Sequence, residues 1–136
     1  MSAPDGYVTF AHPSRYLELI GPLYQAADDP ARVALRIDER HTNSRGFLHA
    51  GVLVAVADVV MGHTAHPCRT PDTGLVTASL TTEFPGSAHL GEWVHGTATT
   101  RRVGRRLAFT SAEFTVAGRL VLTASGIFAV TEPPRS

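Results

Sequence analysis

The chain has 136 residues, 43% of them hydrophobic, which is enough for one domain with a hydrophobic core. Its formal net charge is zero, which argues against a broad surface for nucleic acid or for an anionic membrane. The single cysteine excludes an internal disulfide and is typical of a reducing cytosol, so we expect a cytoplasmic protein. The N-terminus lacks a basic segment followed by an apolar run, so no secretory signal is expected.

Residues 1–30 are expected to form a helical lead-in to the domain. Apolar residues recur at roughly helical spacing within 12–25, and Pro13-Ser14 is a suitable start for a short helix. Gly21-Pro22 interrupts that pattern, and residues 27–30 predict a turn. The alternation in Val33–Ile37 then predicts a strand.

The segment Leu48–His66 is apolar at almost every position. Its many valines favour a strand, but it is longer than most strands, so we predict a central helix that ends before Pro67. Asp58 is the only carboxylate inside it. If that helix is buried, a desolvated and unpaired carboxylate costs several kcal/mol, so Asp58 must either have a partner or perform a function.

Four strand-like runs follow the predicted helix and are separated by short turn sequences, which indicates antiparallel neighbours. They cover residues 75–84, 92–102, 105–116 and 120–131, and residues 132–136 form a tail. The pattern predicts an α+β fold in which an antiparallel sheet wraps around one buried helix. We expect residues 1–136 to form one domain.

One motif runs from the loop before the predicted helix into the helix itself, and its members are His41, Asn43, Gly46, His49, Gly51 and Asp58. This pattern resembles the hotdog-fold thioesterases of the 4-hydroxybenzoyl-CoA thioesterase superfamily, and within them the PaaI-like acyl-CoA thioesterases of phenylacetate metabolism. The resemblance implies five or six antiparallel strands around one long helix. It also implies a homodimer that pairs two sheets edge to edge, often a homotetramer, with acyl-CoA hydrolysed at the dimer interface.

The resemblance assigns roles to several residues of the motif. Asp58 would be the general base that activates a water, or a nucleophile, and the N–H groups of Ala50 and Gly51 would hold the oxyanion. Asn43 would hold a water or the substrate carbonyl, although an Asx turn explains it equally well. The family usually has glycine at the position of Ala50, and the added methyl group could narrow the site or require an unfavourable backbone angle.

Two further polar residues are assigned less directly. By resemblance, Thr77 would reach Asp58 or the water from the partner subunit, although threonine is also simply common in strands. His49 precedes Asp58 by nine residues, which is about 13 Å along a helix and too far for a catalytic pair. We therefore interpret His49, and likewise His41, as organisers of the loop and of the helix start.

Substrate-binding residues are inferred from their position in the predicted fold. The residues expected to line the acyl pocket are Phe47, Val54, Met61 and Phe84. The arginines that flank the turn at Val103-Gly104 could bind the phosphates of coenzyme A or lie in solvent at a hairpin tip, and they are Arg101, Arg102, Arg105 and Arg106.

A metal site and a cofactor are not expected. His63, His66 and Cys68 form a His-x-x-His-x-Cys pattern, but a structural zinc site needs four ligands and no second cluster of ligands exists in the sequence. Coenzyme A would enter only as part of the substrate.

The sequence therefore favours an acyl-CoA thioesterase that acts on an aryl- or medium-chain acyl group through an Asp58-activated water. One alternative is a hotdog-fold hydratase or dehydratase acting on acyl-CoA or acyl-carrier protein, which would need a histidine near the carboxylate. The other is a non-catalytic acyl-CoA-binding module. Neither nucleic acid nor a membrane is expected as a partner.

Overall fold

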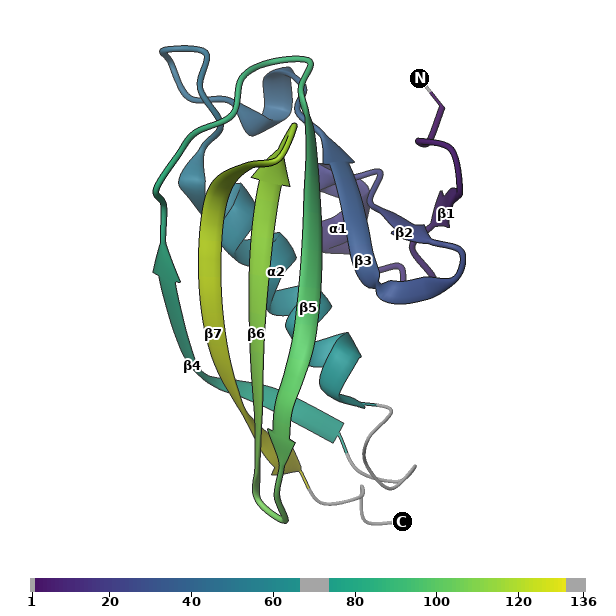
Figure 1. Cartoon of the computed structure of the whole chain (residues 1–136), viewed down its shortest axis with the longest axis vertical. Helices are drawn as coiled ribbons and strands as arrows, with labels where there is room; N and C mark the ends of the chain where they lie inside the picture. The colour runs from purple at the N-terminus through teal and green to yellow at the C-terminus, as the bar shows by residue number, and fades with distance from the viewer. Residues whose placement is uncertain (1, 67–73, 132–136) are drawn as a thin grey trace.

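The computed structural model describes residues 2–66 and 74–131 (Figure 1). The elements follow one another as β1 (Tyr7–Thr9), α1 (Arg15–Ile20), β2 (Tyr24–Ala26), β3 (Asp29–Arg36), a 3₁₀ turn at Glu39–His41, α2 (Ala50–Ala65), β4 (Gly74–Glu83), β5 (Trp93–Val103), β6 (Leu107–Val116) and β7 (Arg119–Thr131).

All neighbouring strands are antiparallel, in the order β1-β2-β3-β5-β6-β7-β4. In Figure 1 the long strands curve across α2, which confirms the predicted hotdog arrangement of a sheet wrapped around one long helix. The sheet has seven strands where five or six were expected. The two additional strands, β1 and β2, have three residues each, which is too short to show an alternating pattern in the sequence.

The lead-in is less helical than its apolar spacing suggested. The helix α1 covers only six residues, because the hydroxyl of Ser14 accepts the N–H of Leu17 at its start and Gly21 ends it. The N–H of Gly21 donates to the carbonyl of Leu17 at 2.6 Å, and a Cβ at Gly21 would lie 2.5 Å from that oxygen. The chain then enters β2 after three residues.

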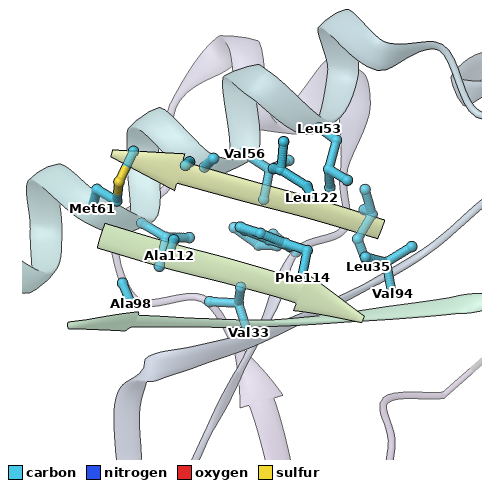
Figure 2. Close-up of a cluster of buried hydrophobic side chains, with 14 of the residues drawn as sticks. Val33, Leu35, Leu53, Val56, Met61, Val94, Ala98, Ala112, Phe114 and Leu122 are labelled. Carbon is cyan, nitrogen blue, oxygen red and sulfur yellow. The ribbon is translucent and has the colours of Figure 1, made fainter. Parts of the chain in front are cut away.

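The helix α2 buries one face against the concave side of the sheet. Figure 2 shows Leu53, Val56 and Met61 of this helix packed towards Phe114 and Leu122 of the strands beneath. The sheet makes room for the Phe114 ring at Gly96, where a Cβ would lie 2.3 Å from a ring carbon. This packing holds α2 in a fixed position over the sheet.

The opposite face of α2 is not covered by the sheet. Ala50, Val54, Asp58 and Gly62 recur at a spacing of four residues and therefore share one helix face, on which they are half-buried or exposed. The apolar neighbours of Asp58 in the sequence suggest a carboxylate desolvated in the core. In the single chain Asp58 is instead half-buried.

The strand β4 forms one edge of the sheet. It pairs with β7 on one side only, so its other side presents unpaired backbone groups along ten residues. Val76 on this strand is 54% exposed. Within the described part of the chain, no helix has both the length and the apolar character needed to cross a membrane.

Candidate active site

Asp58 lies beside Thr77 of the same chain. The hydroxyl of Thr77 donates a hydrogen bond to Oδ1 of Asp58 at 2.6 Å. The resemblance predicts that Thr77 reaches Asp58 or the water from the partner subunit, but β4 runs alongside α2 and supplies the contact with Asp58 within one chain. One carboxylate oxygen is thereby fixed, and Oδ2 is left for another ligand.

A cavity of about 190 Å³ opens next to this pair, between α2 and the strands β4 and β7. Its lining residues are Asp58, Val59, Gly62, His63, His66, Leu75, Thr77 and Phe128. The cavity therefore combines a carboxylate, a hydroxyl, two imidazoles and an apolar surface.

Half of these lining residues were not indicated by the sequence pattern, and they are Val59, Gly62, Leu75 and Phe128. Gly62 could have been found because it follows Asp58 by four residues on one helix face. Phe128 could not, because it reaches the cavity through its pairing with Thr77 across the β4–β7 ladder, which joins distant parts of the chain.

His63 lies in an aromatic cluster at the border of the cavity. Its ring stacks on that of His12 with centroids 4.2 Å apart and planes at 11°. Phe10 meets the His63 ring edge-on, with a centroid distance of 5.6 Å. Burial lowers the pKa of His63 below its ordinary value, and the nearby His12 and His66 lower it further.

The metal pattern was built on His63, His66 and Cys68. Cys68 lies outside the described residues. Among residues 2–66 and 74–131, no group of three or more histidine, cysteine, aspartate or glutamate side chains could hold a metal ion.

The first turn of α2 is capped by His49. The N–H of Gly51 donates to Nδ1 of His49 at 3.1 Å, and the N–H of Val52 donates to the His49 carbonyl at 3.1 Å. A Cβ at Gly51 would lie 3.2 Å from the His49 ring, so glycine gives the imidazole its space. His49 thus organises the helix start, as its spacing from Asp58 suggested.

Ala50 is the first residue of α2. Within the described part of the chain, no group accepts a hydrogen bond from its N–H. Among the described residues, Ala117 is the only non-glycine with a positive φ. The alanine that replaces the family's usual glycine therefore causes no backbone strain.

His41 is fully buried and holds the preceding loop in place. Its Nδ1 accepts the N–H of Asp38 at 2.9 Å, which leaves the Nε2–H to donate to the carbonyl of Ile20. Its own carbonyl accepts the N–H of His49 at 2.7 Å. His41 therefore links the end of α1 to the start of α2.

Asn43 forms an Asx turn, which was the structural alternative to a role in holding a water or the substrate carbonyl. Its side-chain oxygen accepts the N–H groups of Arg45 and Phe47 at 2.9 and 3.2 Å. Gly46 completes this turn with a φ of +81°. The side-chain oxygen of Asn43 is therefore occupied by its own loop, and its NH₂ group is the end that can meet a substrate.

The donor and the carboxylate of one chain are far apart. Asp58 follows Ala50 by eight residues on a continuous helix, which corresponds to about 12 Å along the axis. A single thioester carbonyl cannot contact both groups of the same chain.

The four residues expected to line the acyl pocket do not lie in the cavity beside Asp58. Met61 is fully buried in the core. Phe47 packs on His89, with ring centroids 4.8 Å apart. Phe84 borders a separate cavity of about 330 Å³, and Val54 is half-buried on the outward face of α2.

Arg101, Arg102, Arg105 and Arg106 are all exposed at the β5–β6 hairpin. Among the described residues, the only side-chain hydrogen bond of these arginines joins Nε of Arg101 to the Ser111 hydroxyl at 2.9 Å. The hydroxyl of Thr100 donates to the carbonyl of Thr64 at 3.3 Å, so the hairpin adjoins the C-terminal end of α2 (Figure 1). These charges therefore lie near the C-terminal end of α2, beyond Asp58.

Comparisons with known proteins agree with this geometry. The model of the Thioesterase superfamily matches residues 45–123. The PA0474 protein of Pseudomonas aeruginosa is 38% identical over 130 residues, which cover 94% of this chain and 97% of that protein. Human acyl-coenzyme A thioesterase 13 is 30% identical over 101 residues, which cover 73% of this chain and 71% of that protein.

Solved structures share the fold at low sequence identity. BH2602 of Bacillus halodurans, solved with CoA, has a TM-score of 0.80 at 18% identity and covers 88% of this chain and 78% of its own. The PaaI protein of Escherichia coli has a TM-score of 0.67 at 18% identity, with 77% and 75% covered. The chain therefore belongs to the thioesterase superfamily, and the protein is an enzyme that hydrolyses thioesters.

Proposed function

We propose that the protein is an acyl-CoA thioesterase in which Asp58 activates a water that attacks the thioester carbonyl of an aryl- or medium-chain acyl-CoA. The observation that carries this proposal is the Asp58 carboxylate, fixed by Thr77 at the mouth of a cavity. The name of the human relative, acyl-coenzyme A thioesterase 13, supports coenzyme A as the thiol. The CoA in the BH2602 structure supports it too.

The chemistry needs only water and the groups of the chain. Asp58 takes a proton from the water as the oxygen attacks the thioester carbon, and the carbonyl oxygen becomes an oxyanion. The N–H of Ala50, at the positive end of the α2 dipole, stabilises that charge. When the tetrahedral intermediate collapses, the C–S bond breaks and the proton on Asp58 passes to the departing thiolate. No cofactor takes part in this scheme.

The site is complete only when two chains contribute to it. Since about 12 Å separates Ala50 from Asp58 along α2, the donor must come from a second copy of the chain. The open edge of β4 and the uncovered face of α2 are the surfaces that support a homodimer. The family resemblance extends this assembly to a tetramer, which the molar mass in solution tests.

Other predicted residues take supporting roles in this scheme. Gly51 and His49 shape the helix start, because their hydrogen bond leaves the Ala50 N–H as the free donor. The NH₂ group of Asn43 lies on the loop that precedes Ala50 and is the group that would contact a substrate carbonyl or the water. The arginines of the β5–β6 hairpin would bind the phosphates of coenzyme A.

The test is thiol release from a panel of aryl- and alkyl-CoA esters, measured for the wild type and Asp58→Asn. Removal of a general base lowers turnover by roughly 10²–10⁴-fold, and we expect a loss of this size on every ester that the wild type hydrolyses. Asp28→Asn is the control, because Asp28 is exposed and pairs with Arg32 on the surface.

Unchanged turnover in Asp58→Asn would refute the mechanism. A wild type that releases no thiol from any acyl-CoA would favour the binding module. Hydration without thiol release would favour the hydratase alternative, for which His63 and His66 in the Asp58 cavity would be the available histidines.

A further inference from the structure

A second cavity, of about 400 Å³, is formed by the N-terminal part of the chain. All of the described residues that line this N-terminal cavity lie between Thr9 and Arg40, before α2 begins. The cavity beside Asp58 is lined from α2, β4 and β7 instead, and β1 and β4 lie at opposite ends of the sheet (Figure 1). Within the described part of the chain the two cavities share no lining residue, so the N-terminal cavity is a separate site.

The wall of the N-terminal cavity is mainly apolar. Its apolar side chains are Phe10, Pro13, Leu17, Pro22 and Leu23. Three of them, Phe10, Leu17 and Leu23, are at most 7% exposed and belong to the hydrophobic core, so the packing of the domain holds this wall in place. Small-molecule pockets have volumes of roughly 300–1,000 Å³ and combine an apolar wall with a few polar groups. The N-terminal cavity has this size and this composition.

The positive charge at the cavity, on Arg40, is already paired. Its Nε and one terminal nitrogen donate to the Asp38 carboxylate at 3.2 and 2.7 Å. Its two terminal nitrogens also donate to the carbonyls of Leu19 and Gly21 at the end of α1. The hydrogen bond from Arg40 lowers the pKa of the Asp38 carboxyl below its ordinary value, so Asp38 is ionised at neutral pH and offsets the charge of Arg40. The Arg40–Asp38 pair therefore offers little attraction to an anionic ligand.

The negative charge at the cavity, on Glu18, is exposed and unpaired. Among residues 2–66 and 74–131, no hydrogen bond or ion pair involves the Glu18 carboxylate. Since Arg40 is the other charged residue of the lining and is paired with Asp38, one carboxylate charge remains. Complementary charge determines which partner a binding surface accepts. The N-terminal cavity is therefore complementary to a ligand with an apolar body and one positive charge.

We propose that the N-terminal cavity is a second binding site, which takes a small molecule with an alkyl or aryl body and one ammonium group. The apolar body lies against Phe10, Leu17 and Leu23, and the ammonium group pairs with Glu18 at the opening. An alkylamine carries this charge at neutral pH, as the lysine side chain does. The site does not depend on the proposed thioesterase function, because Asp58, Thr77 and Ala50 lie elsewhere in the fold.

The experiment uses probes of one chain length and different charge. Hexylammonium, hexanol and hexanoate are titrated separately into the ¹⁵N-labelled full chain, and ¹H–¹⁵N spectra report both the affinity and the place of binding. We expect shifts at the amides of Leu17, Gly21 and Leu23. Hexylammonium should bind about fivefold more tightly than hexanol, the scale of one exposed ion pair, and hexanoate should bind more weakly than hexanol.

A series of alkylammonium probes tests the apolar part of the site. From butylammonium to hexylammonium, the affinity should rise about fourfold for each added CH₂ group, because each buried CH₂ contributes about 0.8 kcal/mol. An affinity that does not depend on chain length would mean that the ammonium group pairs with a carboxylate on the surface and the cavity stays unused, which would overturn the proposal.

The Glu18→Gln variant tests the carboxylate. It removes the charge and keeps the size of the side chain, so the preference for hexylammonium over hexanol should disappear while hexanol binds as before. Glu39→Gln is the matched control, because Glu39 is also an exposed glutamate but lies outside the cavity. Asp58→Asn is the second control, because the cavity beside Asp58 also combines a carboxylate with apolar residues. We expect both controls to keep the preference.

The other outcomes that would overturn the inference concern place and charge. Probe-induced shifts at the amides around Asp58, together with a loss of binding in Asp58→Asn, would place the ligand in the other cavity. Equal affinities of the wild type for hexylammonium and hexanol would remove the ammonium group from the proposal. A preference for hexylammonium that survives in Glu18→Gln would show that this carboxylate is not its partner.

Discussion

The hydrogen bond from Thr77 to Asp58 determines how the reactive carboxylate is presented. It fixes Oδ1 at 2.6 Å from the threonine hydroxyl and leaves Oδ2 for another ligand. In the proposed mechanism Thr77 is a positioning residue, since it would act through Asp58. A carboxylate held in one orientation is a more efficient base, because proton transfer requires defined geometry.

We predict that Thr77→Val lowers kcat about tenfold and leaves KM almost unchanged, because the lost hydrogen bond orients Asp58 and does not bind substrate. Thr77→Ser should retain most of the rate, since it keeps the hydroxyl. Steady-state kinetics of thiol release provide the measurement. Thr81→Val, an exposed change on the same strand, is the control. Equal losses in the serine and valine variants would contradict the assigned role.

The sequence identifies residues of the site only where they lie close together in the chain. Asp58, Ala50 and His49 belong to one contiguous motif, so the family resemblance could assign roles to them, and helix spacing alone indicated that His49 is too far from Asp58 for a catalytic pair. Thr77 could be predicted as a contact of Asp58, but the sequence does not reveal which chain supplies it. The place of His63 depends on His12, a contact between distant segments that no local pattern indicates.

The elements of the fold differ in how clearly they are encoded. The helix α2 was predictable because its length outweighed its valine content, and the strands β4, β5, β6 and β7 lie within two residues of their predicted ranges. Long amphipathic or alternating runs carry many residues of signal. The strands β1 and β2 carry three residues each, and their formation depends on pairing with β3 and not on local preference.

The β6–β7 hairpin contains the one strained turn residue among the described residues. Ala117 and Gly118 have φ values of 49° and 79°, and two positive φ angles in a two-residue loop favour Asn-Gly. We predict that Ala117→Asn raises the free energy of unfolding by about 1 kcal/mol, because asparagine tolerates the left-handed conformation that alanine disfavours.

Denaturant unfolding of the wild type and Ala117→Asn measures this change. Ala27→Asn is the control, because Ala27 lies in an exposed turn without a positive φ. A gain of the same size in Ala27→Asn would show that strain at position 117 is not the cause.

At the scale of the whole molecule, one feature of α2 connects fold and function. The helix presents a donor at its first residue and a carboxylate eight residues later on the same uncovered face. If two such helices pair antiparallel about a two-fold axis that passes near Val54, midway between the two groups, Ala50 of one helix lies beside Asp58 of the other. Two equivalent sites then form, each with Ala50 from one chain and Asp58 from its partner.

Mixed dimers test this arrangement directly. Ala50→Pro removes only the N–H donor, because proline is well accepted at the first position of a helix and His49 already has the extended backbone, ψ 120°, that precedes proline. A dimer of one Ala50→Pro chain and one Asp58→Asn chain has one intact site and one doubly impaired site. We predict that it shows about half of the wild-type thiol release, whereas each variant homodimer is nearly inactive.

Two affinity tags, one on each variant, allow co-expressed mixed dimers to be purified away from both homodimers. A mixed dimer as inactive as the two homodimers would mean that the Ala50 N–H and the Asp58 carboxylate act from the same chain. That outcome would contradict the proposed site, because about 12 Å along α2 separates the two groups within one chain. Recovery of activity in the mixed dimer requires that the groups be supplied in trans. Since Thr77 contacts Asp58 within one chain, a dimer of Asp58→Asn with Thr77→Val should stay impaired at both of its sites.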